Sequence, residues 1–148
     1  MVHGKWKSIL LAAFTVIWIN EALAMNEEKC VYGELHVPAS IAGFDRHQLE
    51  IRVFARDPRV ADRPAEVVGK ADIPGFKHQA GTETVEKFSV NLNQPYRADL
   101  SYYATFFILK DGVRTLHGQC AHAEGASCSV LGKAAPSELQ VRFAEMPH

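Results

Sequence analysis

Hydrophobic and polar side chains alternate with a period of two through most of the chain after residue 30. Such alternation predicts half-buried β-strands, because successive side chains of a strand point to opposite faces of its sheet. Turns rich in Gly, Pro, Asp and Asn separate the runs, which cover residues 31–37, 49–53, 66–73, 87–92 and 138–143. We expect Pro74-Gly75 to end the third run and residues 76–84 to form a loop.

The strongest local signal lies in residues 100–117, where two β-rich runs flank Asp111-Gly112. Asp-Gly between such runs favours a two-residue type I′ hairpin turn, because both central positions need a positive φ. Adding this hairpin gives about seven strands with almost no helical periodicity. The pattern predicts an all-β domain, an antiparallel β-sandwich of immunoglobulin-like size, with a small closed barrel as the alternative.

The first strand of this hairpin is apolar on both of its faces. Its expected core face consists of Leu100, Tyr102, Ala104, Phe106 and Ile108. The opposite face carries Tyr103 and Phe107, and Phe54 also points away from the core set of its own strand. Two interpretations stay open: a loop such as residues 76–84 covers these aromatics, or they form an exposed surface that binds a partner.

The first 24 residues show a different pattern. Two lysines precede an uncharged, mostly apolar run at residues 8–19, and Ala22-Leu23-Ala24 is the small-x-small pattern that signal peptidase reads. The run of about 12 residues is shorter than the roughly 20 that a membrane-spanning helix needs. We therefore predict a cleaved signal peptide at residues 1–24 and one domain at residues 25–148, periplasmic or secreted, without a membrane span.

The chain has three cysteines, Cys30, Cys120 and Cys128, which is an odd number for a compartment that permits disulfides. Cys120 and Cys128 lie on either side of a turn rich in Gly, Ala and Ser, so we expect them to pair. Pairing of Cys30 with either of them stays open. A disulfide that closes so short a loop would stabilise the fold by about 2–3 kcal/mol.

His117, Cys120 and His122 lie close together in the sequence. One thiolate and two imidazoles are suitable ligands for copper or zinc, so a metal-binding envelope protein is the alternative function. Two observations weigh against it. Positions 117 and 120 point to opposite faces of a strand, and a disulfide with Cys128 would consume the thiolate.

Charge and motifs narrow the functional classes. Basic and acidic side chains number 16 and 17 and are interspersed, so the sequence contains no basic run of the kind that binds nucleic acid. It also lacks a nucleophile elbow, a zinc-protease helix motif and a phosphate-binding glycine loop. We predict a protein that is not an enzyme, uses no cofactor and acts by recognition.

The order of features from Val31 to Gly118 resembles the small envelope lipoprotein domain shared by YbaY-type proteins and YscW-type pilotins of secretion systems. The residues that carry the resemblance are GELHVP at 33–38, LEIRVF at 49–54, the loop at 57–65, FSVNL at 88–92, and YYATF at 102–106 with the Asp111-Gly112 turn. The resemblance implies a β-sandwich without known catalysis. Some members of the family act as chaperones or pilots that bind the tail of an outer-membrane protein.

The chain departs from this family at its N-terminus. A lipoprotein carries a lipobox ending in cysteine at the cleavage site, whereas Cys30 follows Asn26-Glu-Glu-Lys29. The sequence thus predicts an exported domain that binds a protein or peptide partner in the envelope without a lipid anchor. Binding would use an exposed strand edge or the aromatic surface around Phe54, Tyr103 and Phe107.

Overall fold

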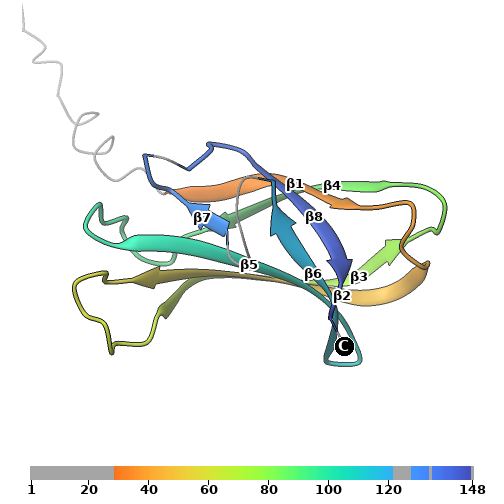
Figure 1. Cartoon of the computed structure of the whole chain (residues 1–148), viewed down its shortest axis with the longest axis horizontal. Coiled ribbons are helices and arrows are strands. Elements are labelled where there is room, and N and C mark those ends of the chain that lie inside the picture. The colour runs from red at the N-terminus through yellow and green to blue at the C-terminus, as the bar shows by residue number, and fades with distance from the viewer. Residues whose placement is uncertain (1–28, 122–127, 134, 148) are drawn as a thin grey trace, which may run out of the picture.

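The computed structural model describes residues 29–121, 128–133 and 135–147. Within these ranges the chain forms β-strands and no helix (Figure 1). The strands are β1 (Cys30–Val37), β2 (Phe44–Arg56), β3 (Glu66–His78), β4 (Thr84–Asn91), β5 (Ser101–Lys110), β6 (Val113–Cys120), β7 (Cys128–Val130) and β8 (Leu139–Glu145). No described segment is a helix long and apolar enough to cross a membrane. The predicted signal peptide lies outside the described residues.

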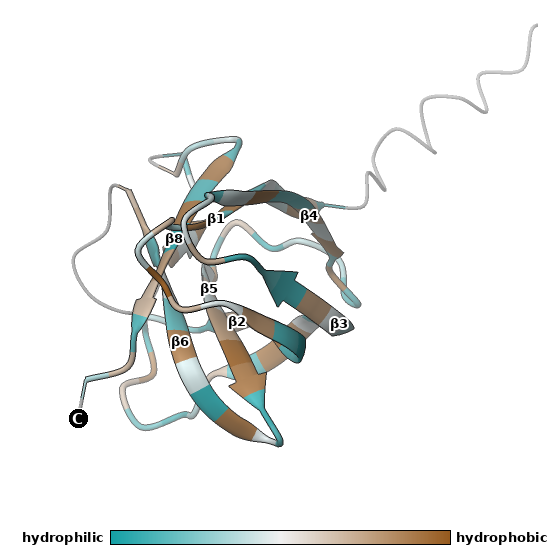
Figure 2. Ribbon diagram, turned by 90° about the vertical axis from the view of Figure 1, so that its right-hand side faces the viewer, coloured by the Kyte–Doolittle hydropathy of each residue, from teal (hydrophilic) through white to brown (hydrophobic). Residues whose placement is uncertain are grey.

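All eight strands belong to one mixed sheet. Seven of them follow the order β3-β2-β5-β6-β8-β1-β4, and the short β7 pairs with β5. Neighbours are antiparallel except β1 and β8, which are parallel. The two ends of the sheet approach each other, because the backbone N–H of Asn93 donates to the carbonyl of Val68 at 2.7 Å. The sheet is therefore nearly closed into a barrel (Figures 1 and 2).

The sandwich prediction is confirmed only in its all-β class. One mixed sheet curls around a single core instead of two antiparallel sheets facing each other, which is closer to the barrel alternative. β2 and β3 have 13 residues each, and their pairing contains three register shifts. Bulges bend a strand and increase its twist, so long bulged strands help one sheet to curl back on itself.

One of these bulges explains why Pro74-Gly75 does not end β3. Ile73 lies opposite Leu49 and Phe76 lies opposite His47, so β3 has one extra residue in this stretch. Gly75 adopts a φ of 73°, and Pro74 is tolerated because β3 is an edge strand. The expected loop at residues 76–84 is instead the end of β3, a tight turn and the first residue of β4.

The core lies on the inward face that the alternation predicts. On β5 the residues Tyr102, Ala104, Phe106 and Ile108 are all buried, and Phe106 meets Phe88 edge-on at 5.1 Å between ring centroids. The turn after β5 is confirmed, with φ values of 50° at Asp111 and 79° at Gly112. Hydrophilic and hydrophobic residues follow one another along β6 in Figure 2, as expected for a strand with one face inside.

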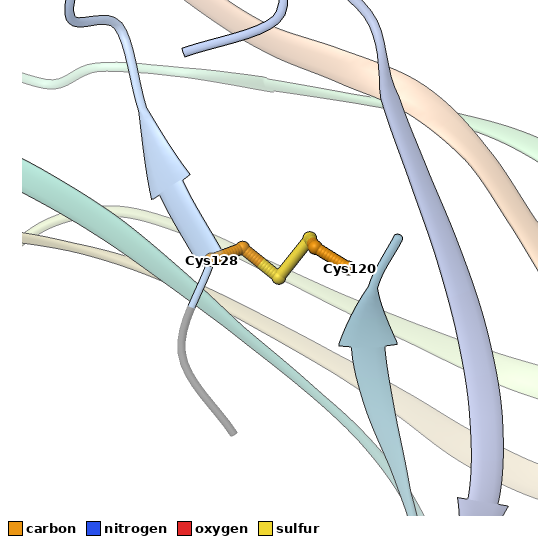
Figure 3. The surroundings of a disulfide bond; sticks show 2 residues. All are labelled: Cys120 and Cys128. Atoms are coloured by element: carbon orange, nitrogen blue, oxygen red, sulfur yellow. A yellow bond between two sulfur atoms is a disulfide. The ribbon is translucent and has the colours of Figure 1, made fainter. Parts of the chain in front are cut away.

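The predicted disulfide between Cys120 and Cys128 is confirmed and joins the end of β6 to β7 (Figure 3). Both strands lie along β5, which pairs with β7 through residues 102–104 and with β6 through residues 107–110. Cys30 keeps a free thiol, 2.9 Å from the hydroxyl of Ser89. The sequence pattern did not reveal β7, because three residues are too few to show an alternation.

Candidate partner-binding surface

Phe54 and Tyr103 lie directly opposite each other on the outward faces of β2 and β5. Their rings stack, with centroids 5.0 Å apart and planes inclined by 16°. Both side chains are half-buried. Residues 76–84 do not cover them, since His78 pairs with Phe44 at the other end of β2. The expected covering loop is therefore absent at these aromatics, which stay partly exposed.

The strand register extends this pair across four strands. Val67 of β3 lies opposite Phe54, and Ser129 of β7 lies opposite Tyr103. We call Val67, Phe54, Tyr103 and Ser129 the aromatic row. Val67 is 42% exposed, so the apolar surface continues onto β3. Sequence reasoning missed Val67 and Ser129, because the alternation within a strand does not show which residues of other strands lie beside it.

Phe107, the third aromatic of the predicted surface, is separate from the row. It lies four residues further along β5, which is about 13 Å. The guanidinium of Arg114 sits 3.9 Å from the centre of the Phe107 ring and donates to Glu50 at 2.9 Å. Between Phe107 and the row, Arg52 donates to Asp72 at 2.8 Å. Charged side chains therefore cover Phe107 and divide the predicted surface.

The alternative docking feature, a free strand edge, occurs at β3 and β4, the two ends of the sheet. Bulges and Pro74 interrupt the β3 edge, which are known ways of protecting an edge from pairing. Beside the turn that joins the strands, the imidazole of His78 bonds the hydroxyl of Thr84 at 2.7 Å. At the other end of these two strands, the backbone N–H of Asn93 donates to the carbonyl of Val68. β3 and β4 are thus joined near both ends, but no strand pairing runs between them along the described residues.

A hollow of about 660 Å³ opens at the end of the barrel where β2 begins. Its apolar part is formed by Ile41, Phe44, Leu116 and Met146, and Arg114 contributes charge. A second hollow of about 470 Å³ lies against Phe44 and is lined by polar residues of β3, β4 and their turn. Neither hollow was expected from the sequence, since each combines segments far apart in the chain.

An arginine–aspartate cluster lies at the opposite end of β2. The guanidinium of Arg59 donates twice to Asp57 and once to Asp99. These hydrogen bonds lower the pKa of Asp57 to about 2. Hydrogen bonding from Arg97 lowers the pKa of Asp99 as well. Both carboxylates are thus ionised at neutral pH and are matched by arginine.

The metal-site alternative is not supported. Cys120 is bound to Cys128, so its sulfur cannot act as a thiolate ligand in this state. His117 lies 3.1 Å from the side-chain amide of Gln119, and His122 is outside the described residues. The described ranges contain no group of three His, Cys, Asp or Glu side chains placed to hold a metal ion.

Comparison with known proteins gives a structural likeness. No protein-family model matches the sequence, and no curated protein matches it. The fold is similar to the solved structure of an alternative pilotin from the type II secretion system of Vibrio cholerae, with a TM-score of 0.50 and 16% sequence identity. The match covers 78% of this chain and 96% of the pilotin chain. At this identity the likeness concerns the fold, and the YbaY and YscW relationship stays a prediction.

Proposed function

We propose that this protein is an exported, non-enzymatic module that binds a protein partner in the cell envelope, as a pilotin-like or chaperone-like protein. The fold likeness to a secretion-system pilotin supports a protein partner. The disulfide between Cys120 and Cys128 supports export, because disulfides persist in oxidising compartments. The binding residues would be those of the aromatic row.

The observation that carries this proposal is the half-buried stack of Phe54 on Tyr103, continued by exposed Val67. Apolar surface costs roughly 25 cal/mol per Å² while it stays in water, so a partner that covers the row gains that energy. Aromatic residues also contribute strongly to protein interfaces, because they bring a large rigid area at low entropic cost. Phe107 is less suited to this role, since Arg114 already covers its ring.

Site-specific photo-crosslinking in cells that export the protein tests the proposal. A photoreactive phenylalanine analogue at position 103 should crosslink one partner, and Phe54→Ser in the same chain should remove most of that crosslink. The matched control is the same analogue at Tyr32, an outward tyrosine of β1 that is 44% exposed. Equal crosslinking at positions 32 and 103, or none at 103, would contradict binding through the aromatic row.

A further inference from the structure

Basic side chains flank the aromatic row on two sides. Arg56 follows Phe54 by two residues on β2 and therefore shares its outward face. On the other side, Lys70 of β3 lies opposite Arg52, which precedes Phe54 by two residues. Arg56 and Lys70 are both exposed. Each lies one step of about 7 Å along the strands from the level of the Phe54 ring.

The carboxylates near these two cations already have partners. Asp72 accepts from Arg52, Asp57 accepts from Arg59, and Glu66 accepts from the side-chain amide of Gln94 at 2.6 Å. No ion pair reaches Arg56 or Lys70 from any residue that the structure describes. The row thus lies between two positive charges that have no ion-pair partner among the described residues, on a chain whose net charge is −1.

We propose that the aromatic row binds an extended, acidic segment of the partner, in which an apolar residue has Asp or Glu two positions before and after it. Residues at positions i−2, i and i+2 of an extended segment share one face and repeat at about 7 Å. The apolar side chain stacks on Phe54 and Tyr103, while the two carboxylates reach Arg56 and Lys70. This inference rests on the proposed function and adds the chemistry of the partner.

Three synthetic nine-residue peptides serve as probes: Phe flanked at ±2 by Glu, Phe flanked at ±2 by Lys, and Ser flanked at ±2 by Glu. Binding is measured by titrating each peptide into the ¹⁵N-labelled domain. The Glu-Phe-Glu peptide should bind at least about tenfold more tightly than the others and shift the amide signals of the aromatic row. Its advantage over the lysine peptide should shrink as salt is added, because salt screens exposed charges.

Charge reversal identifies the residues responsible. Arg56→Glu combined with Lys70→Glu should reverse the preference, so that the lysine peptide binds more tightly. The matched control, Lys87→Glu combined with Lys110→Glu, makes the same change in net charge on β4 and at the end of β5, away from the row, and should keep the original preference.

Equal affinity for the acidic and basic peptides, a preference for the basic peptide, or no binding of any peptide would overturn the inference. If position 103 still crosslinks a partner in those cases, the proposed function stands and only the acidic chemistry fails. If the acidic peptide binds the row but position 103 yields no partner in cells, the proposed function fails instead.

Discussion

The two faces of β2 and β5 carry similar apolar residues in different surroundings. On the inner face, the residues Leu49, Ile51, Val53, Ala104, Phe106 and Ile108 are each at most 1% exposed. On the outer face, Phe54 and Tyr103 stack on each other and are only half-buried. The inner face is covered by the rest of the curled sheet, whereas only neighbouring side chains contact the outer face.

This difference shows what a single curled sheet does with a strand that is apolar on both sides. In layered folds other elements cover both faces of a central strand, and aromatic residues on either face then belong to a core. A nearly closed barrel has only one interior, so Phe106 stabilises the fold while Tyr103 on the same strand stays available for recognition.

Among these variants, truncation of Phe106 should lower the stability most. We expect Phe106→Ala to lower the free energy of unfolding by about 3–5 kcal/mol, because it leaves a cavity at a site only 1% exposed. Tyr103→Ala on the outer face is the matched control and should cost about 1 kcal/mol, the energy of a partly exposed aromatic pair. Urea unfolding of both variants measures the difference, and similar losses would contradict the assignment of inner and outer faces.

Removing the disulfide should have the next largest effect. Cys120→Ser combined with Cys128→Ser should lower the free energy of unfolding by about 2–3 kcal/mol, since the closed loop is short. Because β7 contributes Ser129 to the aromatic row, amide exchange at Ser129 should also accelerate while exchange at Val67 stays unchanged. Cys30→Ser is the control and should cost at most about 1 kcal/mol, the value of its bond to Ser89. Uniform acceleration across the row would argue against a local role for β7.

Acidification should have the smallest effect on stability, and it should act through the arginine–aspartate cluster at the end of β2. The pKa of Asp57 falls from 3.8 to about 2 on folding, so its ion pair stabilises the fold above about pH 4. That stabilisation is lost as the pH falls through about 2, because the carboxylate becomes protonated. Denaturant unfolding between pH 5 and pH 2 should show a shallower loss of stability in Asp57→Asn and in Arg59→Gln than in the wild type. Parallel profiles in all three proteins would contradict this origin of the acid sensitivity.

The sequence pattern predicted the local elements better than their arrangement. Alternation located β1, β2 and β8, and Asp111-Gly112 located the hairpin, because each signal depends on neighbours in the chain. It failed at Pro74-Gly75, where a bulge on an edge strand replaced the expected turn. The alternation could not predict the parallel pairing of β1 with β8, because these strands stand at opposite ends of the described chain.

The candidate site was likewise predicted in part from the sequence, while the rest became visible only in the structure. The face to which Phe54, Tyr103 and Phe107 belong followed from strand periodicity alone. That Phe54 stacks on Tyr103 while Arg114 covers Phe107 followed from the register of β2 and β5 and from the position of β6. The contribution of Val67 and Ser129 depended on two further strand pairings.

The sequence by itself determined that this chain is built of β-strands, which side chains turn inward and where the main hairpin lies. These properties arise from steric preferences and hydrophobic burial within short segments. Only the tertiary structure decided that one mixed sheet curls nearly closed and that an aromatic row lies between Arg56 and Lys70 on its outer face. Register and curvature come from contacts between strands distant in the chain, which the alternation within each strand does not encode.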